Sequence, residues 1–256
     1  MYRVFFVFLL VLLFFPSASA QGARLTVSAA ISLREGFEQI AKEFEAAHPG
    51  YQLALNFASS GHLQRQIERG APVDVFASAA KRQMDALAKA KQIHPGSRRV
   101  FATNRLVLIR PKKNGFVKSF STLGRDFRGR LVIGNPAHVP AGSYAKQLLE
   151  SLGYWKSLQP KLVLSDHVRQ VLDYVSRGEV DAGIVYRTDA LNGKKRVDVV
   201  EEAPSGSHEP IEYPIAIVAG TRNLDGAEAF VRFVISERGQ QILVRFGFGP
   251  GPRVVR

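Results

Sequence analysis

Small and hydroxyl residues gather where apolar strand patterns run into helical patterns. This happens in four segments, "SAAISL", "FASSGHL", "HVPAGSYA" and "SDHVRQ". The residues at these junctions include Ser32, Ser60, Ala141 and Val168. The N–H groups in the first turn of a helix have no partner inside the helix and carry a partial positive charge, so they bind anions readily. Four such helix starts directed at one cleft would form an anion site without any arginine or lysine.

Each junction taken alone also fits an ordinary helix cap. Ser, Thr, Asp and Asn are the usual N-cap residues, so Ser32, Ser60 and Asp166 would be structural caps in most proteins. The repetition of the pattern favours an anion site.

The sequence patterns of common enzymes are absent. There is no G-x-S-x-G nucleophile turn, no H-E-x-x-H helix and no phosphate-binding G-x-x-x-x-G-K-[ST] loop. The six histidines lack the spacing of metal ligands, so we interpret them as surface or capping residues, with His138 at the surface of its loop. An exported hydrolase using Ser60 with His62 stays as an alternative, but no nearby acid would orient the histidine. The sequence therefore predicts that the protein is not an enzyme.

The elements that would position these junctions alternate between strands and helices. Residues 24–93 contain three strand patterns and three helical patterns in turn, as in a parallel sheet covered by helices. The strands that follow are too many for one sheet, which predicts an α/β fold of two lobes with mixed sheets flanked by helices. The strands near Asn104 and Tyr213 are natural places for the chain to cross between lobes. We predict that residues 21–103 and 220–256 form lobe I and that residues 104–219 form lobe II.

The first twenty residues have the features of a cleaved signal peptide. Arg3 precedes an apolar run over residues 4–15, and Ala18-Ser19-Ala20 supplies the small residues of a cleavage site. An uncleaved membrane anchor is the alternative, although the apolar run is short for a membrane span. The chain has no cysteine, so it has neither disulfides nor an attachment point for a lipid after the signal. We expect a soluble monomer in the periplasm.

The chain carries a formal net charge of +13. Its basic clusters "RPKKNG" and "NGKKRVD" look like turns without interleaved aromatic residues, and export also argues against a nucleic-acid partner. We interpret the charge as a solvated surface that attracts anions, with plain solubility as the alternative.

Several segments resemble one protein family in order and spacing. "FASSGHLQRQIERGAPVDVFASA", "HVPAGSYAK" and "GIVYRTDA" are similar to segments of the periplasmic molybdate-binding proteins of bacterial ABC transporters. The resemblance covers nearly all of the chain after the signal. It implies the two-lobed solute-binding fold of type II, with two chain crossovers that form a hinge and lobes that close on the ligand. It also implies high-affinity binding of molybdate and tungstate for delivery to a membrane permease, with no cofactor and with molybdenum present only as the bound oxyanion.

The resemblance also assigns ligand contacts to five residues. It implies that the hydroxyls of Ser32 and Ser60, the backbone N–H groups of Ala141 and Val168, and the phenol of Tyr186 hold a tetrahedral oxyanion. We expect Tyr186 to act as a latch that completes the donor shell only when the lobes close, with a packing role for its ring as the alternative.

Two positions depart from the pattern of the family. Gly61 stands where another hydroxyl residue is expected, and Ile31 stands where a small residue is usual. Neither is one of the five proposed donors, so the departures bear on selectivity. The same scaffold binding another tetrahedral oxyanion, such as sulfate, therefore stays as an alternative.

Overall fold

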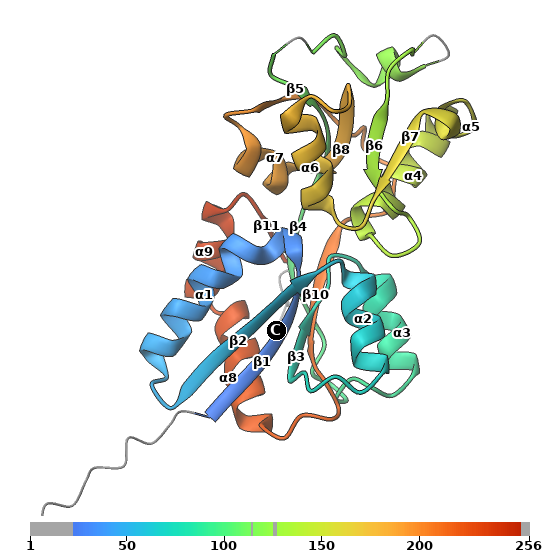
Figure 1. Ribbon diagram of the computed structural model, residues 1–256. Coiled ribbons are helices and arrows are strands. Elements are labelled where there is room, and N and C mark those ends of the chain that lie inside the picture. The colour runs from blue at the N-terminus through green and yellow to red at the C-terminus, as the bar shows by residue number, and fades with distance from the viewer. Residues whose placement is uncertain (1–22, 114, 125–126, 252–256) are drawn as a thin grey trace, which may run out of the picture.

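The computed structural model describes residues 23–113, 115–124 and 127–251. The predicted signal peptide, residues 1–20, lies outside this range. The chain folds into two lobes, each built on one sheet with helices packed against it (Figure 1). The predicted α/β class, with two lobes and mixed sheets, is confirmed. No helix in the part of the chain that the structure describes is long and apolar enough to cross a membrane.

The first lobe contains a six-stranded mixed sheet. Its strand order is β11 (Gly249–Pro250), β4 (Arg99–Thr103), β10 (Glu212–Ile217), β3 (Val75–Ala77), β1 (Ala23–Ala30) and β2 (Tyr51–Ala58). Strand β1 is parallel to β2 and β3, whereas β10 is antiparallel to β3 and β4.

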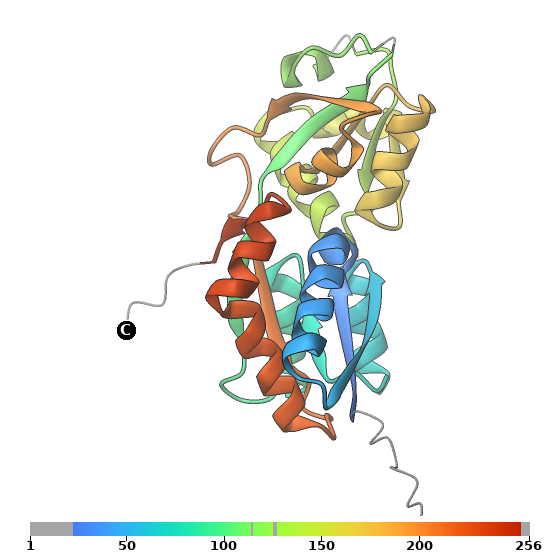
Figure 2. The ribbon, with the colours of Figure 1, turned by 90° about the vertical axis from the view of Figure 1, so that its left-hand side faces the viewer.

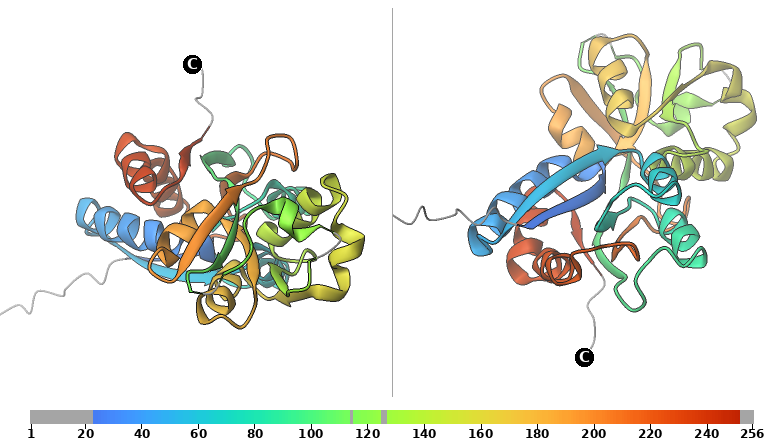
Figure 3. Two further views of the ribbon diagram at one scale, coloured as in Figure 1. Left: turned by 90° about the horizontal axis from the view of Figure 1, so that it is seen from above. Right: turned by 60° about the horizontal axis from the view of Figure 1, so that its bottom comes forward.

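The helices of the first lobe cover both faces of this sheet. They are the 3-10 turn η1 (Ile31–Leu33), α1 (Arg34–Ala47), α2 (Ser60–Glu68), α3 (Lys81–Lys89), α8 (Leu224–Ile235) and α9 (Glu237–Arg245). Helices α8 and α9 run beside α1 (Figure 2), and α2 and α3 lie on the other side of the strands (Figure 3, right). Helix α1 packs against the rest of the lobe through its apolar face. Phe37, Ile40 and Phe44 recur at helical spacing on this face and are fully buried.

The second lobe contains a five-stranded mixed sheet. Its strand order is β7 (Leu162–Ser165), β6 (Leu131–Gly134), β8 (Ala182–Tyr186), β5 (Leu106–Pro111) and β9 (Val197–Glu202). Strand β6 is parallel to β7 and β8, and β5 is antiparallel to β8 and β9. The helical elements of this lobe are η2 (Phe120–Leu123), α4 (Pro140–Ser151), α5 (Trp155–Leu158), η3 (Gln159–Lys161), α6 (Val168–Arg177) and α7 (Arg187–Gly193).

The chain passes between the two sheets twice. The first passage lies between β4, which ends at Thr103, and β5, which begins at Leu106. The second lies between β9 and β10, in residues 203–211. The predicted lobe II, residues 104–219, therefore extends too far, because β10 pairs within the first sheet. An apolar strand pattern such as "EYPIAIV" shows that a strand forms but not which neighbour it pairs with.

Candidate functional site

The five predicted ligand residues line one cavity between the lobes. Its lining consists of Ala30, Ile31, Ser32, Ala58, Ser59, Ser60 and Ala79 from the first lobe and Val139, Pro140, Ala141, Val168 and Tyr186 from the second. The volume of this cavity is about 10 Å³. Each of the five predicted residues is at most 3% exposed to solvent. Residues spread over more than 150 positions of sequence thus line one small cavity, and no residue of this lining carries a charge.

The junctions between strands and helices bring these residues together. In the first lobe β1 leads into η1 and β2 into α2, which places Ser32 and Ser60 at the carboxyl ends of neighbouring parallel strands. In the second lobe β6, β7 and β8 lead into α4, α6 and α7. Ligands of α/β sheets bind at such carboxyl edges, and here the two edges face each other across the cavity.

Two of the predicted donors are backbone N–H groups at helix starts. Ala141 is the second residue of α4, after Pro140, and the cap residue Val139 makes no side-chain hydrogen bond to the helix. Val168 is the first residue of α6, where His167 accepts instead from the N–H of Gln170. At these positions an N–H has no carbonyl partner four residues earlier within its own helix, so both can donate to a ligand.

The hydroxyl of Ser32 is positioned by two side chains of a hydrogen-bond chain, those of Tyr213 and Asn104. Its Oγ lies 3.1 Å from the phenol oxygen of Tyr213, and Nδ2 of Asn104 donates to that same oxygen at 3.1 Å. Burial raises the pKa of Tyr213 well above its ordinary value, so the phenol keeps its proton. The phenol can then donate to Ser32, which leaves the proton of Ser32 to point into the cavity. Sequence reasoning missed Tyr213 and Asn104 as partners of the site.

The hydroxyl of Ser60 is positioned in a similar way. Its Oγ accepts from the N–H of Ala79 at 3.0 Å, which leaves its own proton for the cavity. The phenol of Tyr186 donates to the carbonyl of the same residue, Ala79, at 3.3 Å. Because Ala79 and Tyr186 belong to different lobes, this bond crosses the boundary between them. Burial raises the pKa of Tyr186, so it also stays a neutral donor.

Ser59 is a further hydroxyl in the lining. It occupies the N-cap position of α2 without making a cap bond, and its Oγ is buried without a hydrogen-bond partner among the described residues. The doubled serine of "FASS" was the only sequence signal for it.

The lobes also touch beside the cavity, where Gly61 faces the loop before α4. The N–H of Gly61 donates to the carbonyl of His138 at 3.0 Å, and a Cβ at Gly61 would lie only 2.5 Å from that oxygen. The glycine that departs from the family pattern therefore permits a close approach of two backbones.

The sequence analysis predicts that the side chain of His138 lies at the surface of its loop, and this prediction is wrong. The ring of His138 stacks on His62 with ring centroids 4.5 Å apart, and its side chain is 13% exposed. The stack engages His62 with another histidine, and Ser60 bonds to a backbone N–H, so the geometry does not support a Ser60–His62 hydrolase.

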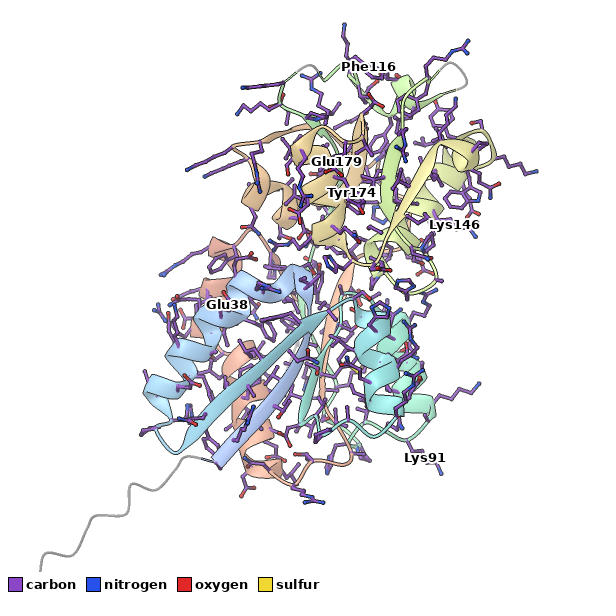
Figure 4. The ribbon with its side chains drawn as sticks, viewed as in Figure 1. Glu38, Lys91, Phe116, Lys146, Tyr174 and Glu179 are labelled. Atoms are coloured by element: carbon purple, nitrogen blue, oxygen red, sulfur yellow. The ribbon has the colours of Figure 1, made fainter. Side chains whose placement is uncertain are left out.

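A groove elsewhere on the molecule is built differently. It has a volume of about 600 Å³ and lies at the far end of the first lobe, around Lys91 (Figure 4). Its lining is charged, with Arg24, Lys91, Arg222 and Asp74 among polar and apolar residues. Among the residues that the structure describes, no cluster of His, Cys, Asp or Glu could hold a metal ion.

Comparison with known proteins agrees with the two-lobed fold. The family described as bacterial extracellular solute-binding protein matches residues 25–249. This chain belongs to that family. Family members are solute-binding proteins and not enzymes, which confirms the sequence-based prediction, and a solute held in the cavity is a ligand and not a cofactor.

Two relatives of this solute-binding protein share more than a third of its residues, and the name of one of them states a solute. This protein is 39% identical to the molybdate-binding protein ModA of Escherichia coli (strain K12), over 91% of this chain and 91% of that protein. It is 38% identical to the putative ABC transporter substrate-binding lipoprotein YvgL of Bacillus subtilis (strain 168), over 90% of this chain and 88% of that protein. The resemblance to molybdate-binding proteins is thus confirmed.

A solved structure shows the same similarity in three dimensions. The periplasmic molybdate-binding protein of Azotobacter vinelandii superposes with a TM-score of 0.78 at 27% identity, covering 88% of this chain and 98% of that one. The sulfate-binding protein SubI of Mycobacterium tuberculosis H37Rv has a TM-score of 0.75 at 18% identity, which shows a shared fold alone.

Proposed function

We propose that this solute-binding protein binds molybdate, and tungstate in the same way, in the periplasm and delivers the anion to the membrane permease of an ABC transporter. The observation that carries the proposal is the convergence of five buried residues from both lobes on one small cavity: Ser32, Ser60, Ala141, Val168 and Tyr186. The names of relatives that are 36–39% identical support the identity of the anion.

The donors suit an anion that has acceptors only. A fully ionised tetrahedral oxyanion can accept a hydrogen bond at every oxygen, so a shell of hydroxyls and N–H groups satisfies it without leaving unpaired groups. Monoprotonated phosphate would bring an O–H of its own and find no acceptor in such a shell, so the site disfavours it. The protein would contact the oxyanion oxygens only, with no direct ligand to molybdenum.

Neutral donors also allow the anion to be released. Charge-assisted bonds to a buried arginine are about twice as strong as neutral ones and would slow delivery. Dipoles and hydroxyls that come from two lobes are withdrawn together when the lobes separate. Tyr186 has a single O–H, which donates to the carbonyl of Ala79 across the lobe boundary in this structure. We propose that this O–H turns to the anion when one is bound and so acts as the latch.

Sulfate is the second candidate, because it has the same charge and the same donor requirement but is smaller. Calorimetric titration of the mature protein with molybdate, tungstate and sulfate tests the proposal. We expect sub-micromolar binding of molybdate and tungstate with one anion per monomer and much weaker binding of sulfate. Tight sulfate binding without any heat from molybdate would assign the site to sulfate.

A further inference from the structure

One arginine beside the cavity joins the two lobes. Nη1 and Nη2 of Arg169, on α6, donate to the two carboxylate oxygens of Glu35, on α1, at 2.7 and 2.5 Å. Nε of Arg169 lies 2.6 Å from Oδ1 of Asp189, on α7. The Arg169 side chain is 15% exposed, Glu35 31% and Asp189 fully buried. The two contacts with Glu35 are hydrogen bonds, whereas the contact with Asp189 is an ion pair without hydrogen-bond geometry.

Each member of this trio sits beside a proposed ligand donor. Arg169 directly follows Val168, and Glu35 lies three residues after Ser32, just inside the helix that follows the serine. Glu35 and Arg169 thus lie next to donors that belong to opposite lobes. The pair that they form therefore exists only when the two donor segments are close together.

Asp189 anchors the arginine within the second lobe. It lies three residues after Tyr186, in the first turn of α7, so the third donor segment is tied in as well. Burial raises the pKa of Asp189 to about 6, and the guanidinium of Arg169 opposes that rise. Because Arg169 and Asp189 both belong to the second lobe, opening the lobes leaves this pair intact and keeps the guanidinium pointed at the first lobe.

The pair with Glu35 is the part that lobe opening must break. Two parallel N–H···O bonds hold the carboxylate in one geometry, and Nδ2 of Asn192 adds a weaker contact to it at 3.3 Å. Glu35 is negative, so its direct electrostatic effect on a bound dianion is repulsive. A benefit of Glu35 to anion binding can therefore come only from holding the lobes together.

We propose that Glu35 and Arg169 form a clasp that stabilises the closed arrangement of the lobes and so positions the donors of both lobes around the anion. The inference rests on the proposed oxyanion-binding function. The clasp acts through the lobes and not by contact with the ligand, so it slows release of the anion without changing how the anion enters the open cleft.

The test is a comparison of two isosteric variants on the same helix. Glu35→Gln removes the negative charge and one of the two acceptor oxygens that bind Arg169. Glu38→Gln, one turn further along α1 on an exposed side chain, removes the same charge without touching the pair (Figure 4). Both side chains are at least partly solvent-exposed, so both variants should fold, which thermal melting checks. Stopped-flow mixing of each mature protein with molybdate gives the association and dissociation rates, and calorimetry gives the Kd.

We expect Glu35→Gln to raise the Kd for molybdate about threefold to tenfold, through a faster dissociation rate at an unchanged association rate. Glu38→Gln should stay within about twofold of the parent protein. An unchanged or tighter Kd in Glu35→Gln, with the parent binding molybdate normally, overturns the clasp and leaves the proposed function standing. A parent protein that binds neither molybdate nor tungstate overturns the proposed function, and the clasp falls with it.

Discussion

The two lobes contribute different kinds of donor to the cavity. The first lobe supplies the hydroxyls of Ser32 and Ser60, each held in place by a donor behind its oxygen. The second supplies the backbone N–H groups of Ala141 and Val168 at helix starts, together with one phenol. A hydroxyl can rotate and can be removed by one substitution, whereas a backbone N–H moves only with its helix. Under the proposed function, the backbone donors of the second lobe would be fixed by their helices, and the serine hydroxyls of the first lobe would be the donors that substitution can adjust.

The largest effect on molybdate binding should come from shifting the start of helix α4. A Cβ at Gly142 would lie 1.8 Å from the carbonyl oxygen of Gly134, so Gly142→Ala must push the start of α4 away from the end of β6. We expect molybdate binding to weaken on the order of 100-fold, because the Ala141 N–H moves with the helix. We expect the free energy of unfolding to fall by about 1–3 kcal/mol from overpacking.

Calorimetry and urea denaturation measure these two losses for Gly142→Ala. The matched control is Gly50→Ala, where an added Cβ meets nothing within 4 Å. Normal molybdate affinity in Gly142→Ala would show that the start of α4 is not part of the donor shell.

The next largest effect on molybdate binding should come from removing the serine hydroxyls of the first lobe. Ser32→Ala and Ser60→Ala should each weaken molybdate binding by about 1–3 kcal/mol, since each leaves a charged oxygen short of a donor. Ser157→Ala is the control, because Ser157 is exposed on α5, outside the lining of the cavity, and its loss should leave affinity within about twofold. Unchanged Kd values in both serine variants would place the ligand outside this cavity.

A smaller effect is expected from the phenol that links the lobes. Tyr186→Phe keeps the ring, which is buried in the core, and removes the O–H that reaches Ala79. We expect about tenfold weaker binding through faster dissociation, with an unchanged melting temperature. Stopped-flow release of molybdate measures this rate. A wild-type dissociation rate would assign Tyr186 to packing alone.

The smallest effect concerns pH and the stacked rings at the lobe boundary. Burial, followed by the nearby His62 and Arg65, lowers the pKa of His138 below its ordinary value of 6.5. The unfolded chain therefore binds this proton more readily than the folded one, and its contribution to stability is present above pH 6.5 and lost as the pH falls below it. Urea denaturation at pH 7.5 and 5.5 should show a larger loss on acidification in the parent than in His138→Gln. Equal losses would contradict the lowered pKa.

Local patterns in the sequence were enough for the fold class and the strand-to-helix junctions. Ala141 and Val168 could be placed at helix starts in this way, because a helix start is a local property. The roles of the five residues as donors came from the family resemblance and stay a prediction. The sequence analysis did not predict helix α7, because "RTDALNG" is short and has little apolar periodicity. The place of β10 was wrong because strand pairing joins residues far apart in sequence.

The supporting partners of the site could not be found from local patterns. Tyr213 meets Ser32 across 181 positions, and Arg169 meets Glu35 across 134. The contact between Tyr213 and Ser32 depends on how the strands of the first lobe pair, and the contact between Arg169 and Glu35 depends on how the two lobes are oriented. No short segment of sequence records either. The charged residues just after Ser32, Val168 and Tyr186 were visible in the sequence, but nothing local indicated that they meet.

The most direct test of the donor shell is a crystal structure of the mature protein with tungstate, using the anomalous scattering of tungsten to locate the anion. We predict one strong peak in the cavity between the lobes. We also predict that the anion's oxygens lie about 2.7–3.2 Å from the hydroxyls of Ser32 and Ser60, the N–H groups of Ala141 and Val168, and the phenol of Tyr186. A peak in the groove around Lys91, or an anion held by arginine or lysine side chains, would contradict the account.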